Sequence, residues 1–206
     1  VVHLMGTLME RQLDPPGGRF LIAKMKELGI RVLLGKSTTA IPADRCATGV
    51  ESMDGEHLDA SLVVVAAGIR PNVELGRKAG LTVKRGIVVN DFMETSNPDI
   101  FAVGECVEHR GVCYGLVAPL FDQGKVLAAT ITGRRGPTYE GTVQAAKLKI
   151  VGVEMFSAGD IDDDGSEPVR YEDPTLGVYK KVAVRGGKLS GVILVGDTSD
   201  SHKYME

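Results

Sequence analysis

Hydrophobic and polar positions near the start of the chain follow a helical spacing. Leu21, Met25 and Leu28 recur at intervals of four and three residues, which places them on one face of a helix. Asp14 precedes this run as an N-cap, and Gly29 follows it as a residue suited to a C-terminal cap. The pattern predicts one helix that begins after Asp14 and ends before Gly29.

Extended segments flank this helix and continue to residue 68. The predicted strands span residues 1–4, 30–34, 38–41, 50–53, 56–60 and 61–68. Asp54 and Gly55 predict a two-residue hairpin turn between two of them. Residues 61–68 are a continuous apolar run, which is typical of a central strand buried on both faces. Together these elements predict an α/β arrangement.

The pattern changes after residue 72. We predict strands at residues 87–90 and 100–103, a helix at about 119–132, a linker at 134–137, strands at 142–153, 178–184 and 189–195, and the start of a helix at 198–206. Gly186 and Gly187 predict a tight turn between the last two strands. The predicted domain organisation has three parts, at residues 1–72, 73–136 and 137–206.

Composition narrows the functional classes. Of 206 residues, 43% are hydrophobic and 25% are charged, and the formal net charge is −3. No run of eighteen apolar residues occurs, so the sequence predicts no membrane span. Nucleic acid is not expected as the main partner, because phosphate binding needs a basic face.

The three cysteines indicate a compartment. Cys46, Cys106 and Cys113 form no CxxC motif and cannot all pair, which predicts a reduced, cytoplasmic protein. The irregular spacing of the last two around His109 falls short of a zinc signature, so no metal site is predicted.

The most informative candidate chemistry lies at residues 95–106. A short apolar strand ends at Val103 and is followed by Gly104 and Glu105. Nucleotides bind at the carboxyl ends of strands in open α/β sheets. Gly104 lets a ligand approach the backbone closely, and the Glu105 carboxylate can accept hydrogen bonds from sugar hydroxyls. This segment therefore predicts part of a nucleotide site.

Two further segments have candidate binding residues. Ala67 and Gly68 end the predicted buried strand, and the alternative for them is a plain proline turn after a strand. Ala118 and Pro119 stand at the start of the predicted helix, where free N–H groups and a partial positive charge suit an electron-rich ring edge or an anion. The alternative there is an ordinary loop and cap.

These motifs carry a resemblance to known reductases. Residues 95–106 resemble the second flavin-binding motif of the pyridine-nucleotide-dependent flavoprotein reductases, with Glu105 in place of the usual Asp. Residues 66–72 resemble the segment that leads back to the FAD domain in the same enzymes. The wider resemblance, to the large-subunit family of assimilatory nitrite reductases and next to rubredoxin and ferredoxin reductases, covers residues 1–72, 86–123 and 139–197.

The resemblance implies a fold and a set of cofactors. The expected fold class is α/β, with partial FAD- and NAD(P)-binding Rossmann-like domains followed by a small α+β C-terminal domain. Residues 1–72 correspond to the later half of the NAD(P)H-binding domain and residues 73–136 to the C-terminal segment of the FAD-binding domain. NAD(P)H would reduce FAD, and electrons would leave for iron–sulfur centres and a sirohaem outside this chain, where nitrite is reduced to ammonia. No catalytic residue is expected, because the cofactors carry the chemistry.

His3 stands at the end of the first strand, where this family usually has an acidic residue that binds the adenosine ribose of NADH. A neutral histidine donates or accepts one hydrogen bond, whereas a protonated one attracts a 2′-phosphate. The choice between NADH and NADPH therefore stays open. The alternative is an ordinary histidine at a strand end that touches solvent.

Two other functions are retained as alternatives. In the first alternative, the chain is a fragment of an NADH:rubredoxin or ferredoxin reductase. In the second, it is a non-catalytic module that docks a redox protein through residues 139–206. The first residue opens directly on a strand, which predicts a piece of a longer enzyme. Expected partners are the other domains of that enzyme or a redox protein, and exposed sheet edges favour a homodimer. Because the G-x-G-x-x-G loop is absent, the chain alone is not expected to bind FAD tightly.

Overall fold

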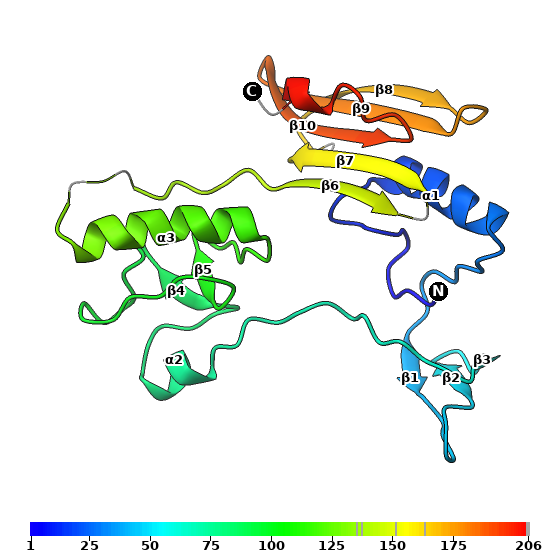
Figure 1. Cartoon of the computed structure of the whole chain (residues 1–206), viewed down its shortest axis with the longest axis horizontal. Helices are drawn as coiled ribbons and strands as arrows, with labels where there is room; N and C mark the ends of the chain where they lie inside the picture. Colours follow the sequence, from blue (N-terminus) through cyan, green and yellow to red (C-terminus); the bar gives the residue numbers. More distant parts are fainter. Residues whose placement is uncertain (135, 137, 151, 163, 205–206) are drawn as a thin grey trace. The chain divides into compact units, whose positions relative to one another are not determined.

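The chain forms two units, which are described separately. The computed structural model describes residues 1–134, 136, 138–150, 152–162 and 164–204. One unit combines Val1–Val65 with Ala145–Glu206, and the other consists of Ala66–Gln144 (Figure 1). The predicted linker includes Arg135 and Pro137, which lie outside the described residues. The three-domain division stays a prediction.

Helix α1 (Pro15–Glu27) forms where the apolar spacing predicts it. The Asp14 carboxylate accepts a hydrogen bond from the backbone N–H of Gly17 at 3.0 Å, which satisfies one of the free donors of the first turn. Gly29 has a φ of 75°, the left-handed conformation that ends a helix. The predicted caps are therefore confirmed at both ends.

The extended segments around α1 form two small pairings. Residues 1–4 and 30–34 run parallel and are joined by a bridge between Val2 and Leu33. An antiparallel sheet in sequence order contains β1 (Thr38–Ala40), β2 (Gly49–Ser52) and β3 (His57–Asp59). Gly55 has a φ of 84° in the turn between β2 and β3, so the predicted hairpin is confirmed.

A five-stranded antiparallel sheet makes up most of the C-terminal part, in the order β6-β7-β10-β9-β8 (Figure 1). Its strands are β6 (Ala145–Ile150), β7 (Val153–Gly159), β8 (Glu167–Asp173), β9 (Val178–Arg185) and β10 (Lys188–Val195). Gly186 and Gly187 have φ values of 57° and 74°, as a tight hairpin turn requires. The predicted turn between β9 and β10 is confirmed.

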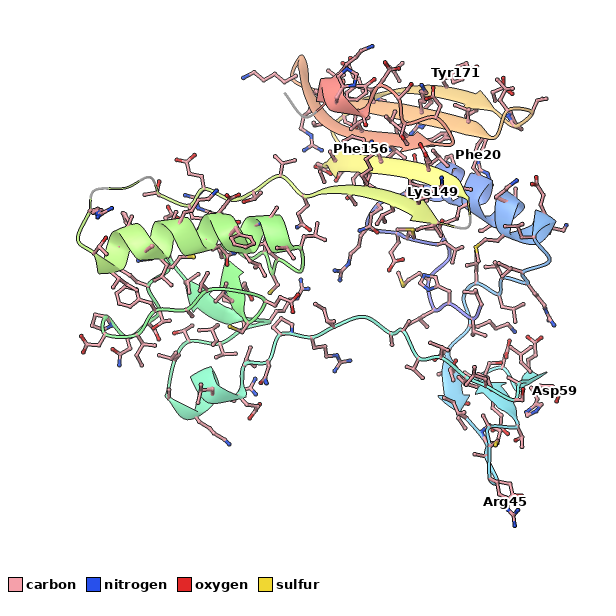
Figure 2. All side chains as sticks on the ribbon, viewed as in Figure 1. Phe20, Arg45, Asp59, Lys149, Phe156 and Tyr171 are labelled. Atoms are coloured by element: carbon pink, nitrogen blue, oxygen red, sulfur yellow. The ribbon has the colours of Figure 1, made fainter. Side chains whose placement is uncertain are left out.

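Strand β10 supplies both faces of the sheet with core residues. Ile193 belongs to one hydrophobic cluster with Leu21 of α1, and Leu194 belongs to another with Phe156 of β7. Successive side chains of a strand point to opposite faces, so β10 is buried on both. Figure 2 labels Phe156 on β7. The sheet and α1 therefore share one core.

Two predictions for the C-terminal part are wrong in detail, and one strand is missed. The single strand expected at residues 142–153 is two strands, because Gly152, with a φ of 79°, lies in the connection between β6 and β7; Val151 lies outside the described residues. The sequence pattern does not predict β8, whose residues are mostly exposed and charged. The expected last helix is the short 3₁₀ helix η1 (Ser201–Tyr204), with residues 205–206 outside the described range.

The buried central strand expected at residues 61–68 is also wrong. The segment belongs to no strand, and Leu62, Val64 and Val65 are 79%, 81% and 72% exposed. A continuous apolar run becomes a buried strand only when neighbours cover both of its edges and both of its faces. Among the described residues no strand pairs with this segment.

The second unit has a parallel pair of strands and two helices. These are α2 (Glu74–Lys78), β4 (Ile87–Val89), β5 (Val107–His109) and α3 (Val117–Ile131). β4 and β5 pair in parallel. The core beneath α3 contains Val89, Met93, Val107, Tyr114, Val126 and Tyr139. Strand β4 and helix α3 are confirmed predictions, whereas the five-residue α2 is not predicted by the sequence pattern.

The strand expected at residues 100–103 is wrong. Only Phe101 of this segment makes a bridge, an antiparallel one with Glu94. The parallel partner of β4 is the later segment β5, and the N–H of Ile87 donates to the carbonyl of Cys106 at 2.8 Å. Gly104 and Glu105 therefore lie in the loop just before a strand rather than directly after one.

Candidate functional site

The backbone at Gly104 is shaped for a close approach. Its φ is 108°, a conformation that residues with a side chain rarely adopt. A Cβ added there would have no non-neighbouring heavy atom within 4 Å. The space above this glycine is open, so a ligand atom can come close to the chain at this point.

A side chain of helix α3 holds the peptide of Gly104 in place by a hydrogen bond. Its N–H donates to the side-chain oxygen Oε1 of Gln123 at 3.1 Å. Gln123 is fully buried, and its Nε2 atom has no partner among the described residues. The full burial of Gln123 holds its side chain, and through it the peptide of Gly104, in one position.

Gln123 is not among the predicted site residues, although the sequence contains a signal for it. Gln123 lies four residues after Pro119 and three before Val126, and all three are buried on α3. A polar side chain on the apolar face of a predicted helix needs a hydrogen-bond partner, which here is the backbone of Gly104.

The predicted neighbours of Gly104 differ in exposure. Glu105 is exposed, so its carboxylate is accessible to a ligand, while Val103 is half-buried. Pro119 is buried in the first turn of α3, and Ala118 beside it is exposed. The N-cap residue Leu116 provides no side-chain hydrogen bond, so the first N–H groups of α3 are left without a side-chain cap.

The segment with Ala67 and Gly68 lies in the same unit as Gly104. Both residues are exposed, and Gly68 has a φ of 80°. The side chain of Ile69 lies 3.4 Å from where a Cβ of Gly115 would be. The structure thus places this segment against the loop that leads into α3.

A polar cluster beside β5 is a second feature that the sequence analysis does not identify. Asp91 accepts hydrogen bonds from Nε of Arg110 at 2.9 Å and from a terminal nitrogen of Arg110 at 2.6 Å, and its Oδ1 lies 2.8 Å from Nε2 of His109. The Arg110 guanidinium, with His109 second, lowers the pKa of Asp91 to about 2. Among the described residues no group of three or more His, Cys, Asp or Glu is arranged to hold a metal ion.

His3 lies in the other unit, near the carboxyl end of the first strand. Its backbone N–H donates to the carbonyl of Leu33 at 2.9 Å, and its carbonyl accepts from the N–H of Lys36 at 3.0 Å. Its ring nitrogen Nε2 lies 3.2 Å from the Glu10 carboxylate. His3 is half-buried, with its side chain 30% exposed, so a role in binding a nucleotide stays a prediction beside the alternative of an ordinary histidine that touches solvent.

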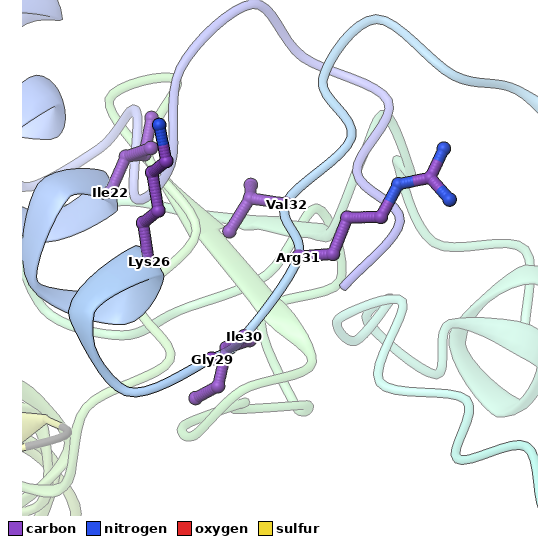
Figure 3. Close-up of a pocket in the computed structure, with 6 residues that line it drawn as sticks. All are labelled: Ile22, Lys26, Gly29, Ile30, Arg31 and Val32. Carbon is purple, nitrogen blue, oxygen red and sulfur yellow. The ribbon is translucent and has the colours of Figure 1, made fainter.

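A pocket of about 390 Å³ lies in the same unit as His3, at the C-terminal end of α1. Its lining residues are Ile22, Lys26, Gly29, Ile30, Arg31 and Val32 (Figure 3). In Figure 3 the side chain of Arg31 extends away from the pocket, and Arg31 pairs with Glu56 at 2.9 Å. None of the predicted site residues lines this pocket.

Comparison with known proteins assigns the class. Residues 1–131 match the family model of the pyridine nucleotide-disulphide oxidoreductases, and residues 145–206 match the rubredoxin NAD+ reductase C-terminal domain. The chain therefore belongs to the pyridine nucleotide-disulphide oxidoreductase family. The predicted fold class is confirmed, and the family and its relatives imply FAD and NAD(P)H as cofactors.

Individual relatives sharpen this assignment. The chain is 47% identical over 204 residues to a nitrite reductase [NAD(P)H] of Bacillus subtilis, covering 98% of this chain and 25% of the relative. It is 31% identical to an NADH-rubredoxin oxidoreductase of Clostridium acetobutylicum, covering 93% and 46%. A ferredoxin reductase structure from Rhodopseudomonas palustris superimposes with a TM-score of 0.83 at 28% identity, covering 98% and 51%. The chain spans about a quarter of the nitrite reductases it matches, and the predicted resemblance is confirmed.

The residues around Gly104 fit a flavin. The open space above the glycine and the accessible Glu105 carboxylate are features that the sugar chain of the cofactor would use. No helix among the described residues is long and apolar enough to cross a membrane.

Proposed function

We propose that this chain is the part of a nitrite reductase flavoprotein module that positions FAD and NAD(P)H for electron transfer. The observation that supports this most strongly is the 47% identity to the Bacillus subtilis nitrite reductase over nearly the whole chain. Electrons would leave for further redox centres outside the chain, and nitrite would be reduced there to ammonia.

Each proposed binding residue has a defined task. FAD, when bound, accepts a hydride from the nicotinamide and releases electrons one at a time. Gly104 gives that cofactor access to the backbone, and Glu105 accepts hydrogen bonds from its sugar-chain hydroxyls. Val103 leads the chain into this loop.

The remaining proposed contacts come from two other segments. Ala118 and Pro119 place the uncapped start of α3 toward the ring, where its partial positive charge stabilises added electron density. Ala67 and Gly68 bring exposed backbone next to the loop that precedes α3. None of these residues transfers a proton, so we assign no catalytic residue.

The wider setting is part of the same proposal. The partners would be NAD(P)H and either the remaining domains of a longer enzyme or a separate redox protein, and the module would act in the cytoplasm. The three cysteines are free, as a reducing compartment requires. A homodimer is also proposed, and analytical ultracentrifugation at several concentrations would test it.

A chimeric enzyme would test the function. This chain would replace the matching quarter of the Bacillus subtilis nitrite reductase, which supplies the other parts. We expect the purified chimera to contain flavin, seen as absorbance near 450 nm, and to oxidise NAD(P)H when nitrite is added. A folded chimera without flavin would contradict the proposal.

A matched pair of glycine variants makes the test specific. Gly104→Ala and Gly80→Ala both place a side chain at a positive φ, of 108° and 72°, and neither new Cβ meets a non-neighbouring atom within 4 Å. Both variants strain the backbone, more so at 108° than at 72°, so the unfolding of each variant is followed alongside its flavin content. Only Gly104→Ala is expected to lower the flavin content, because only there does the methyl group enter the proposed cofactor site.

The second candidate function is an NADH:rubredoxin reductase module. It is favoured by the match of residues 145–206 to the rubredoxin NAD+ reductase C-terminal domain. If the same chimera transferred electrons to added rubredoxin but not to nitrite, this candidate would replace the first. A module that only docks a redox protein would bind rubredoxin without flavin.

A further inference from the structure

Glu10 provides a carboxylate at the strand edge occupied by His3. In dinucleotide-binding folds, an acidic residue near such an edge accepts a hydrogen bond from the ribose 2′-OH of NAD, whereas an arginine accommodates the 2′-phosphate of NADP. Here the edge residue is a histidine, and the acid comes from seven residues further along the chain. The Glu10 carboxylate lies 3.2 Å from Nε2 of His3.

Both side chains are partly open to solvent. The exposed fractions are 30% for the His3 side chain and 37% for that of Glu10. The pair is therefore ordered by its mutual contact and still reachable by a ligand. The carboxylate has two oxygens and about four acceptor positions, so the contact with one ring nitrogen leaves acceptor capacity for a hydroxyl group.

The lysine whose backbone bonds to His3 has its charge directed elsewhere. The backbone N–H of Lys36 donates to the carbonyl of His3, but its side-chain nitrogen contacts the carboxylates of Asp54 and Glu56. The lysine side chain is only 22% exposed. Its charge is balanced by two acids, so it gives a 2′-phosphate little attraction.

We propose that Glu10, held by His3, is the residue that selects NADH over NADPH. The carboxylate accepts a hydrogen bond from the 2′-OH of the adenosine ribose, and it repels the dianionic phosphate at the same position of NADPH. This inference rests on the proposed function, which places a pyridine nucleotide at this edge. Arg11, exposed beside Glu10, is the cation that would favour the opposite selection.

Equilibrium binding to the chimera tests the inference without measuring turnover. Quenching or enhancement of nicotinamide fluorescence gives the dissociation constants of NADH and NADPH. We expect NADH to bind at least about tenfold more tightly, a factor that corresponds to about 1.4 kcal/mol. Glu10→Gln should reduce this ratio severalfold, mainly by strengthening NADPH binding, and Glu10→Lys should reverse it.

Glu27→Gln is the matched control. Glu27 is an exposed carboxylate of α1 that pairs with Lys24 at 2.9 Å, away from the strand edge. This variant makes the same change of charge and should leave the ratio unchanged. If NADPH binds more tightly than NADH to the unsubstituted chimera, or if Glu10→Gln behaves like Glu27→Gln, the inference is overturned.

A second measurement separates this inference from the proposed function. Nuclear magnetic resonance titrations of the 206-residue chain with 5′-AMP and 2′,5′-ADP report on the adenosine end alone. The inference predicts that 5′-AMP shifts the His3 signals at lower concentration than 2′,5′-ADP does, and that Glu10→Gln narrows the difference. Equal or stronger binding of 2′,5′-ADP overturns it, even if the chimera contains no flavin. A flavin-free chimera that folds counts against the proposed function instead.

Discussion

Residues 61–68 and strand β10 are two apolar runs of similar composition that end in opposite environments. Ile193 of β10 is fully buried, whereas Val64 is 81% exposed. Strand β10 is hydrogen-bonded to β7 on one edge and β9 on the other, and its two faces are covered by separate core clusters. Residues 61–68 have no strand partner in the described part of the chain. The comparison shows that an apolar sequence favours burial, but a segment is buried only where neighbouring strands and core residues cover it.

The largest expected effect comes from truncating one side chain in each run. Ile193→Ala should destabilise the sheet by about 4 kcal/mol, because it leaves a cavity in a closely packed core. Val64→Ala should change stability by less than about 0.5 kcal/mol, since little buried surface is lost. Hydrogen exchange of β9 and β10 amides, followed by mass spectrometry, measures both. A cost above about 1 kcal/mol for Val64→Ala would show that residues 61–68 are buried in solution.

A buried polar cluster around Asp14 lies next to the β10 core, and it allows the same comparison to be made for charged groups. The Asp14 carboxylate accepts a hydrogen bond from the Tyr179 hydroxyl at 2.6 Å and lies 3.2 Å from the Lys181 ammonium, whose side chain is 1% exposed. Burial, and next the hydrogen bond to Asp14, raise the pKa of Tyr179. This cluster joins the N-cap of α1 to β9, next to the β10 core.

Asp14→Ala should therefore cost about 3 kcal/mol. It removes the helix N-cap, the acceptor of the Tyr179 hydroxyl and one carboxylate near the buried Lys181 ammonium, which also donates to the carbonyl of Ile161 at 2.6 Å. Asp54→Ala is the matched control, because the Asp54 side chain that pairs with Lys36 is 54% exposed and water screens the interaction. Exchange protection of α1 amides gives the difference, and similar losses for the two variants would contradict it.

In the second unit, removal of a buried hydrogen bond should cause a smaller loss of stability. Gln123→Leu leaves the N–H of Gly104 without its acceptor and should cost about 1–2 kcal/mol. In the chimera it should also weaken FAD binding, because the peptide that meets the cofactor is no longer held. Gln144→Leu, at an exposed position, should change neither quantity. Unaltered flavin affinity in Gln123→Leu would remove the positioning role of this side chain.

The sequence predicts local features of this fold well and long-range ones poorly. The cap at Asp14 and the turns at Gly55 and Gly186 follow from residues close in sequence, and all are confirmed. Whether residues 61–68 and 100–103 form strands depends on which segments meet in space, and both strand predictions fail.

The same division applies to the candidate site. Gly104 and Glu105 are visible as a motif, and the structure gives Gly104 the backbone conformation that only glycine readily adopts. Gln123 and Glu10 contact the predicted site residues Gly104 and His3 from 19 and 7 residues away. No spacing rule in the sequence connects these pairs, so only the folded chain identifies them.

The smallest expected effect concerns the half-buried carboxylate of Asp91. Arg110, and then His109, lower the pKa of Asp91 from its ordinary value of 3.8 to about 2. A depressed carboxyl pKa stabilises the fold when the group is ionised, so the contribution is complete above about pH 4 and is lost as the pH falls toward 2. The stability difference between the natural chain and Asp91→Asn should therefore shrink over this interval, measured by urea unfolding that follows tyrosine fluorescence.

Asp99→Asn, at an exposed position in the same unit, is the control. A difference that stays constant from pH 5 to pH 2 would mean that the contact of Asp91 with Arg110 does not persist in solution.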